Sequence, residues 1–352
     1  MLDLRQNLDS ELNQITSFIR QALNQAPTFL EIDSESEEKE TLVLERNLDQ
    51  LTFENIPEIQ FSGKVASVDG GSAAILSGRS FLVGTYRAGF TIFAKKQRIE
   101  EEVWPLQFAL VTRANKEELY TQAYHHLTGQ APSQTPEMDK ILDRLRLFAE
   151  WSLASELLDK LEPGDLLLLD GSLRATVAIP DNFLEVITKK AWERGIILVG
   201  ISKSTTLYWG DKSPLLPAVV KKAQQSGVER AWYSKIGDLK RELEQSHWFG
   251  TVYIAKFKEA SDFAFRVDVN RLEEQTVDKT FGILSALSSD PAFLGYPYPL
   301  AATHILVRIT PSEIEDLRYR LQRKALESGI SESDWDLLFK DFHLILNADL
   351  NR

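Results

Sequence analysis

Two acidic residues stand in similar local settings, 101 positions apart, each at the end of an apolar run. Asp69 ends the run KVASVD and is followed by GGS, while Asp170 ends the run LLLLD and is followed by GS. An apolar run that ends in Asp-Gly predicts a buried strand with a carboxylate at its end, because glycine lets the backbone turn away at once. Paired carboxylates at neighbouring strand ends suit a divalent metal site for phosphate chemistry. The alternative is ordinary Asp-Gly turn chemistry.

A metal site of this kind needs a third carboxylate, and one predicted helix, Pro136–Leu161, offers two. Glu150 lies beside Leu147, Leu153 and Ala154 and therefore borders the apolar face, whereas Glu156 lies on the solvent face. A carboxylate against apolar surface is costly unless it meets a cation, so Glu150 is the better ligand candidate and Glu156 the alternative. Glu150 also has a simpler explanation, an ion pair with Arg146 one helical turn away.

The stretch GYPYPLAATH, residues 295–304, combines two aromatic residues, two prolines and a histidine. Pro299 suits the first turn of a helix, and His304 then follows about one and a half turns later. A lone histidine is more often an ordinary surface or core residue. The remaining histidines have no comparable setting: His125, His126, His247 and His343.

The composition is that of a soluble globular protein. Of 352 residues 43% are hydrophobic, and none is cysteine, which excludes disulfides and thiolate chemistry. No apolar run is long enough to span a membrane, and the charged, amphipathic N-terminus is not a secretory signal. These features predict a cytoplasmic protein.

The net charge of −12 argues against a protein that coats nucleic acid nonspecifically. The charge is uneven, however, because Glu185–Arg241 carries eleven basic against five acidic residues, a local net of +6. This segment is a candidate DNA-facing wall, with Lys203, Lys221 and Lys222 as phosphate contacts. Ordinary solvated surface is the alternative.

Hydrophobic periodicity predicts the order of the elements. The expected strands are Lys64–Asp69, Phe81–Phe90, Leu106–Val111, Leu166–Asp170, Ile196–Ile201, Thr251–Phe257 and Phe263–Val269. The expected helices are residues 1–24, Pro136–Leu161, Asn182–Arg194, Thr276–Ser288 and Ser312–Glu327, and Gln122–Gln134 is expected to be mainly loop. Three antiparallel strands followed by helix, strand, helix, strand predict an α/β fold with a ribonuclease H-like mixed sheet flanked by helices.

Three regions are expected along the chain. Residues 1–60 hold the N-terminal helix and an acidic linker, and the apolar stripe of that helix is a candidate assembly surface. Residues 61–310 form the ribonuclease H-like domain. Residues 311–352 form a C-terminal helical extension.

At these residues the chain resembles the NurA family, nucleases that process DNA ends together with the hexameric HerA translocase. The resemblance spans roughly Val65 to Arg308. It rests on Asp69 in VDGGS, Glu150 on a helix, Asp170 in LDGSL, and the GYP stretch from Tyr296 to His304. Lys203, in GISKS after a predicted strand, also resembles a family position.

The resemblance implies a ribonuclease H-like core and DNA cleavage that depends on manganese or magnesium, with two bound ions. Asp69, Glu150, Asp170 and His304 would then be metal ligands, and His304 would alternatively position the scissile phosphate. Tyr296 would stack on a base or hydrogen-bond a phosphate. The resemblance also implies exonuclease activity, with or without single-strand endonuclease activity, in double-strand break repair. The implied partners are DNA, a HerA-type hexameric ATPase and a second copy of the chain.

Two other functions stay open. Sugar kinases and actin-like ATPases share a related core and use strand-end Asp-Gly motifs to hold ATP phosphates, although their loops are longer and richer in Gly and Thr. A non-catalytic assembly subunit without metal is the second alternative.

Overall fold

The computed structural model describes residues 42–43, 48–77, 81–205, 207–209, 213–237, 240–241, 248–327, 329 and 331–333. The helix predicted over residues 1–24 lies outside them, and so do residues 334–352 of the predicted C-terminal extension. The chain divides into two compact units. The first holds residues 1–67, 93–97 and 160–301, and the second holds residues 68–92, 98–159 and 302–352.

The main sheet has ten strands, in the order β2-β11-β13-β14-β8-β7-β3-β4-β5, with β6 also paired to β4. Their bounds are β2 Glu54–Asn55, β3 Lys64–Ser77, β4 Phe81–Ala94, β5 Gln97–Val103, β6 Gln107–Thr112, β7 Leu166–Asp170, β8 Ile197–Ser202, β11 Trp232–Gly237, β13 Gly250–Lys256 and β14 Phe265–Asn270. β7 and β8 are parallel, whereas β8, β14, β13 and β11 are successively antiparallel. The sheet is therefore mixed, as predicted for a ribonuclease H-like fold. Two short pairs stand apart, β1 (Leu42–Val43) with β12 (Lys240–Arg241) and β9 (Tyr208–Trp209) with β10 (Ser213–Pro214).

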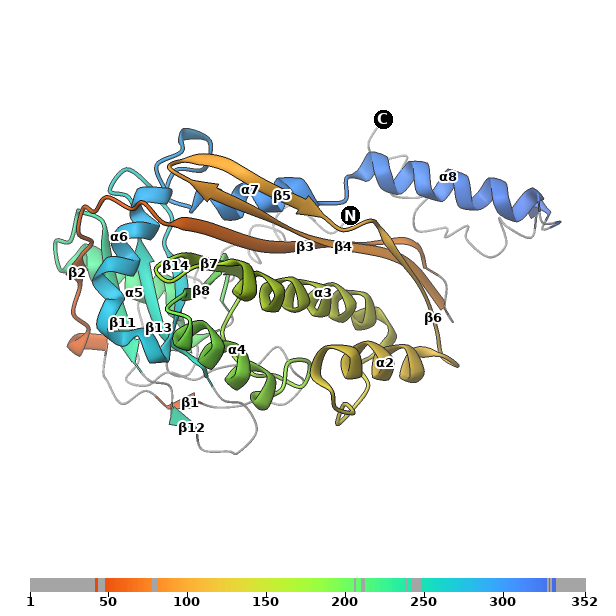
Figure 1. Cartoon of the computed structure of the whole chain (residues 1–352), viewed down its shortest axis with the longest axis horizontal. Helices are drawn as coiled ribbons and strands as arrows, with labels where there is room; N and C mark the ends of the chain where they lie inside the picture. The colour runs from red at the N-terminus through yellow and green to blue at the C-terminus, as the bar shows by residue number, and fades with distance from the viewer. Residues whose placement is uncertain are drawn as a thin grey trace, which may run out of the picture. The chain divides into compact units, whose positions relative to one another are not determined.

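Seven α-helices are described alongside the strands (Figure 1). They are α2 Lys116–Thr128, α3 Met138–Lys160, α4 Asp181–Glu193, α5 Leu215–Gln225, α6 Val277–Leu287, α7 Tyr298–Val307 and α8 Pro311–Glu327. Among the described residues, none of these helices combines the length and apolarity needed to cross a membrane.

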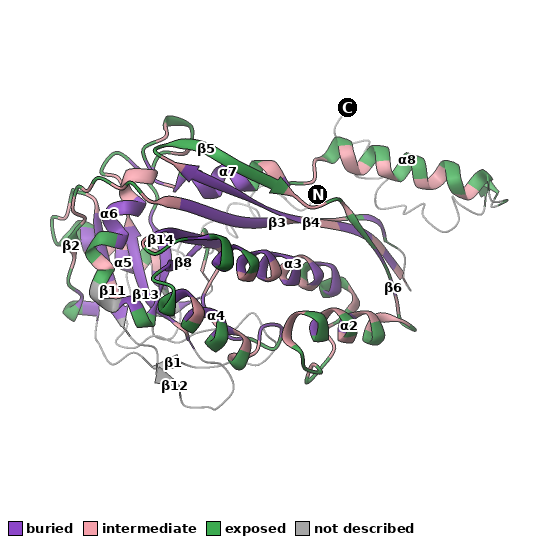
Figure 2. Cartoon of the chain, in the orientation of Figure 1, coloured by how far each residue is buried: buried purple, intermediate pink, exposed green. Residues whose placement is uncertain are grey.

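In the first unit, both faces of the sheet are covered, and β13 shows how. Successive side chains of a strand point to opposite faces. Val252 and Ile254 accordingly join the apolar cluster that includes Val219 of α5, while Tyr253 joins the cluster that includes Phe281 of α6. β13 and β14 are buried along most of their length (Figure 2). The sheet is therefore packed on both faces, and β7 and β8 are neighbouring strands within it.

In the second unit, β3 does not end at Asp69 as the sequence predicts, but continues through Gly70 and Gly71 to Ser77. These two glycines do not form a turn. They leave room for other parts of the chain to approach the strand closely. A Cβ on Gly70 would lie 2.5 Å from Glu150 Oε1, and one on Gly71 would lie 2.5 Å from the carbonyl oxygen of Val307. Asp69 therefore lies inside a long strand, with other elements packed tightly against the residues that follow it.

The expected elements are incomplete in two further respects. Gln122–Gln134 is expected to be mainly loop, but α2 extends to Thr128. Tyr120 and Tyr124 of this helix pack against Phe148 of α3, a tertiary contact that the polar local composition does not reveal. β5, α5 and β11 are not predicted, since β5 is polar and exposed and α5 carries a proline within its first turn.

The helix predicted over Ser312–Glu327 is present as α8. Thr310 and Glu313 form a capping box, in which Thr310 N–H donates to Glu313 Oε2 at 2.7 Å and Glu313 N–H donates to Thr310 Oγ1 at 3.2 Å. Leu317, Leu321 and Ala325 pack near Ile75 and Leu76 of β3. Most other residues of α8 are exposed, and none of the helix is fully buried (Figure 2).

One buried acid gives this fold a testable pH dependence. Burial raises the pKa of Glu273 to about 8, against the opposing effect of hydrogen bonds from Leu198 N–H and the Asn270 side chain. Its Oε2 has no hydrogen-bond partner among the described residues. Between about pH 4.5 and 8 the folded chain therefore holds a proton that the unfolded chain releases, and stability falls as pH rises through this window.

We expect Glu273→Gln to remove this loss of stability. The free energy of unfolding of the wild type should fall between pH 5 and 8 by up to about 1.4 kcal/mol per pH unit from this group, and the variant should lack that component. Urea unfolding at several pH values measures it, with the exposed Glu229→Gln as control. Parallel pH profiles for wild type and Glu273→Gln would contradict the prediction.

Candidate metal centre

Asp170 stands at a true strand end, as predicted. It closes β7, where its register partner on the parallel strand β8 is Ile201. Gly171 follows with φ +139°, a backbone conformation that favours glycine, and its N–H donates to the Ile201 carbonyl at 3.0 Å. A Cβ on Gly200 would lie 2.6 Å from the Gly171 carbonyl oxygen, so the turn lies directly on β8. These backbone contacts fix the position of the main chain from which the Asp170 side chain extends.

Two predicted site residues of the first unit accompany Asp170. Lys203 lies just beyond the end of β8, and its Nζ is 2.7 Å from Asp170 Oδ2. The same ammonium lies 5.7 Å from the ring centroid of Tyr296, which is within cation–π range. The Tyr296 ring in turn packs on Phe265, with centroids 5.2 Å apart. Asp170, Lys203 and Tyr296 thus form one connected set.

Asp69 is almost completely buried, with only 3% of its side chain exposed, and it meets His304 within the second unit. His304 lies on α7, as the position of Pro299 predicts. Its Nδ1 is 2.8 Å from Asp69 Oδ2, although 52% of its side chain is exposed. An ionised carboxylate only accepts hydrogen bonds, so the ring donates through Nδ1–H where Asp69 carries its charge, and Nε2 points away from this bond.

The end of α7 is held by β4. Arg87 Nε donates to the Val307 carbonyl at 2.8 Å, and its Nη2 donates to the carbonyl of Arg308. Thr91 and Thr303 share a buried hydrogen bond of 2.6 Å between their hydroxyl oxygens. A guanidinium at a helix C-terminus also meets the negative end of the helix dipole. Neither Arg87 nor Thr91 is singled out from the sequence, since an isolated arginine in an apolar run carries no specific signal.

Glu150 is buried on α3, and its Oε1 accepts a hydrogen bond from Arg146 Nη1. The ion pair considered from the sequence is therefore present. Burial alone lowers the pKa of Arg146, but the negative charges of Glu150, Asp143 and Asp69 outweigh that effect and raise it. Glu156 is exposed, as expected. Glu150 thus lies over Gly70, next to Asp69, as one member of a negatively charged set.

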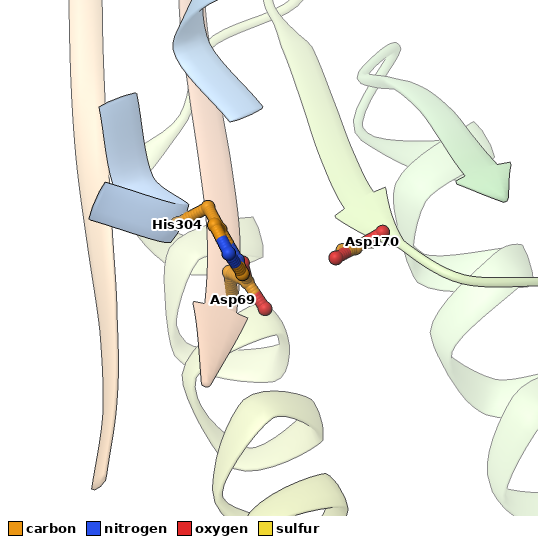
Figure 3. Close-up of side chains that lie close together, drawn as sticks. All are labelled: Asp69, Asp170 and His304. Atoms are coloured by element: carbon orange, nitrogen blue, oxygen red, sulfur yellow. The ribbon is translucent and has the colours of Figure 1, made fainter. Parts of the chain in front are cut away.

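Among the residues that the structure describes, Asp69, Asp170 and His304 each offer a ligand atom, and these atoms all lie within 4.8 Å of one another (Figure 3). Two carboxylates and one imidazole are a donor set that suits Mn²⁺ and other divalent ions. Glu150 does not belong to this group of three.

The two remaining predicted DNA contacts lie on α5. Lys222 Nζ is 2.7 Å from Asp49 Oδ1, so part of its charge is already compensated. Lys221 precedes it on the same helix and is partly buried. The structure therefore leaves Lys203 as the predicted cation that lies against a predicted metal ligand.

The comparisons with known proteins agree with the resemblance. The family profile described as "NurA domain" matches residues 63–309. The crystal structure of the NurA nuclease from Sulfolobus solfataricus has a TM-score of 0.53 and 18% identity, covering 93% of this chain and 98% of that one. A NurA structure bound to dAMP and manganese has a TM-score of 0.46 and 10% identity over 82% of this chain and 92% of that one.

The catalytic domain of human endonuclease V has a TM-score of 0.39 and 15% identity over 88% of this chain and 98% of that one. No protein with curated annotation matches the chain. The NurA profile covers well over half of the sequence, including Asp69, Glu150, Asp170 and His304. The chain therefore belongs to the NurA family.

Proposed function

We propose that this chain is a divalent-metal-dependent nuclease that cleaves DNA. The observation that carries the proposal is the buried carboxylate of Asp69, whose ligand oxygen lies within 4.8 Å of ligand atoms of Asp170 and His304. Removing a carboxylate from water is costly unless a cation or strong donors compensate it. A divalent ion fits that requirement and the chemistry of the donors.

Asp69 and Asp170 would anchor the metal, with Glu150 completing one coordination sphere after leaving Arg146. A nitrogen donor such as His304 Nε2 favours Mn²⁺ over Mg²⁺. When bound at these residues, two such ions would supply an activated water and stabilise the charge that develops on the leaving oxygen.

The other site residues act on the DNA. If His304 does not bind metal, it contacts a phosphate as the imidazolium, with Nδ1–H donated to Asp69 and Nε2–H donated to the phosphate. Lys203 stands beside Asp170 and supplies positive charge for the phosphate backbone. Tyr296 stacks on a base or donates to a phosphate. Lys221 and Lys222 extend the positively charged path along α5.

Finer aspects of the proposal rest on family membership. They are exonuclease activity, with or without single-strand endonuclease activity, in double-strand break repair, together with a HerA-type hexameric translocase. A homodimer and a cytoplasmic location belong to the same proposal. The amphipathic residues 2–24 are the proposed assembly segment.

The alternatives are separable by binding measurements. An actin-like or sugar-kinase-like phosphotransferase would bind an ATP analogue, and it leaves the Asp69–His304 pair without a role. A non-catalytic assembly subunit would not bind Mn²⁺ in calorimetry. The primary test of the proposal is incubation of the purified protein with end-labelled single-stranded DNA in Mn²⁺, Mg²⁺ or EDTA. Cleavage that EDTA abolishes is expected, and its absence in both metals would contradict the proposal.

Asp69→Asn and Asp170→Asn should each reduce cleavage at least about 100-fold, because each removes an anchoring ligand charge. Circular dichroism and thermal unfolding establish that the variants fold, and the exposed Asp262→Asn is the matched control. An Asp170→Asn variant that folds and cleaves at the wild-type rate would refute the metal site.

Glu150→Ala should reduce cleavage far more than Glu156→Ala, since only Glu150 lies next to Asp69. Rates for both variants, measured over a range of Mn²⁺ concentrations, test this contrast. Loss of activity in Glu156→Ala together with full activity in Glu150→Ala would reverse the assignment.

Lys203→Ala should weaken turnover on all DNA sequences alike, because a lysine that binds phosphate reads no base. Replacing Lys221 and Lys222 together should reduce the slope of log affinity against log salt by roughly one unit for each phosphate that the variant no longer binds. Cleavage rates on several DNA sequences measure turnover, and fluorescence anisotropy at several salt concentrations measures the affinity and salt slope of both variants, with Lys324→Ala on α8 as control. Unchanged affinity and slope in both variants would place the DNA path elsewhere.

A further inference from the structure

A fully buried ion pair lies on β14, outside the residues assigned to the site so far. Arg266 Nε donates to Asp268 Oδ1 at 2.8 Å, and Arg266 Nη2 donates to Asp268 Oδ2 at 2.7 Å. Asp268 is completely buried and Arg266 is 6% exposed. Residues two apart on a strand share a face, so the pair is local to β14. Replacing a buried ion pair by apolar residues is often neutral or stabilising, so the presence of the pair is weak evidence that it stabilises the fold.

The Asp268 carboxylate also accepts a third hydrogen bond, from outside its own strand. Leu173 N–H donates to Asp268 Oδ2 at 3.0 Å, and Leu173 lies three residues after Asp170. The Leu173 carbonyl in turn accepts from Phe249 N–H at 2.8 Å. The segment that leaves Asp170 is therefore anchored on both sides of Leu173, and one anchor is a charge-assisted bond to Asp268.

An aromatic ring continues this arrangement. The Arg266 guanidinium lies 4.5 Å from the ring centroid of Trp248, and that of Arg174 lies 5.1 Å from the same centroid. Arg174 and Trp248 also form an isolated β-bridge. Arg266 is thus fixed by both Asp268 and Trp248, and the chain after Leu173 is fixed to the same tryptophan.

Two glycines of the sheet let the segment from Gly171 to Leu173 pack directly against it. Gly200, the register partner of Asp268 on β8, admits the Gly171 carbonyl. Gly250 on β13 admits both Asp268 and Leu173, because a Cβ there would lie 2.8 Å from Asp268 Cβ and 3.2 Å from Leu173 Cβ. The turn after Asp170 therefore rests on backbone, with Asp268 at its far end.

We infer that Asp268, oriented by Arg266, is a positioning residue that holds the Asp170 carboxylate in place through the backbone N–H of Leu173. The inference rests on the proposed function of Asp170 as a metal ligand and deepens it. A ligand on a turn needs supporting contacts to stay within a fraction of an ångström of its working position. Asp268 touches neither metal nor substrate in this role, so it is not a catalytic residue.

Two uncharged double variants isolate the bond to Leu173. Arg266→Met with Asp268→Asn removes the ion pair but keeps an acceptor oxygen for Leu173 N–H. Arg266→Met with Asp268→Leu removes the ion pair and the acceptor. The measurements are kcat and KM for DNA cleavage, Mn²⁺ affinity by calorimetry, and the amide hydrogen-exchange rate of Leu173.

The double variant with Asp268→Leu should lower kcat by about 10-fold or more with KM nearly unchanged, weaken Mn²⁺ binding and speed exchange at Leu173. The double variant with Asp268→Asn should bring all three quantities back towards wild type. Ile283→Val, a core change at α6, controls for reduced stability alone. If the double variant with Asp268→Leu does not fold, Asp268→Ser with Arg266→Met replaces it, because serine is too short to reach Leu173.

Wild-type kcat, Mn²⁺ affinity and Leu173 exchange in the variant without an acceptor would overturn the inference. Equal losses in both double variants would also overturn it, since the acceptor would then not matter. A wild-type protein without nuclease activity would contradict the proposed function instead. Mn²⁺ affinity and Leu173 exchange would still decide the role of Asp268 in that case.

Discussion

In the second unit, the carboxylate of Asp69 is almost entirely removed from water, and much of the surrounding structure compensates that charge. Desolvating a carboxylate is unfavourable unless donors or cations replace the water. His304 supplies one donor, and Arg87 donates a hydrogen bond to the carbonyl of Val307 at the end of the helix that carries His304. Gly70 N–H donates to Asp69 Oδ1 at 2.7 Å and the Arg146 guanidinium adds positive charge, whereas Glu150, which approaches closely over Gly70, adds a second negative charge. The strand, both helices and the glycines are therefore parts of one electrostatic arrangement.

Asp170 reaches its position by different means. It stands at a strand end rather than within a strand, and it is held by a glycine turn, the backbone of β8 and the anchored Leu173. Its carboxylate is less buried than that of Asp69, and the ammonium of Lys203 lies beside it. A fixed, buried carboxylate and a more exposed one beside a lysine form an asymmetric pair.

Much of this arrangement could be predicted from sequence, because it is encoded locally. The β7 bounds, the α3 helix and the place of His304 on α7 follow from apolar runs, helical spacing and proline position. The predicted end of β3 is wrong, because Asp-Gly is ambiguous between a turn and a close backbone approach. The ion pair of Arg266 and Asp268 is not predicted either, because the hydrogen bond from Leu173 N–H to Asp268 joins residues 95 positions apart and is visible only in the fold. Glu150 is found from the sequence, but its nearness to Asp69 needs the fold.

The central claim is that Asp69 and Asp170 hold a divalent metal together. Anomalous diffraction at the manganese absorption edge, from crystals grown with Mn²⁺, tests it most directly. The account predicts a strong anomalous peak bonded to carboxylate oxygens of both Asp69 and Asp170, and no such peak in crystals of Asp170→Asn. Well-ordered crystals at saturating Mn²⁺ with no peak at these carboxylates, or with a peak that persists unchanged in Asp170→Asn, would contradict it.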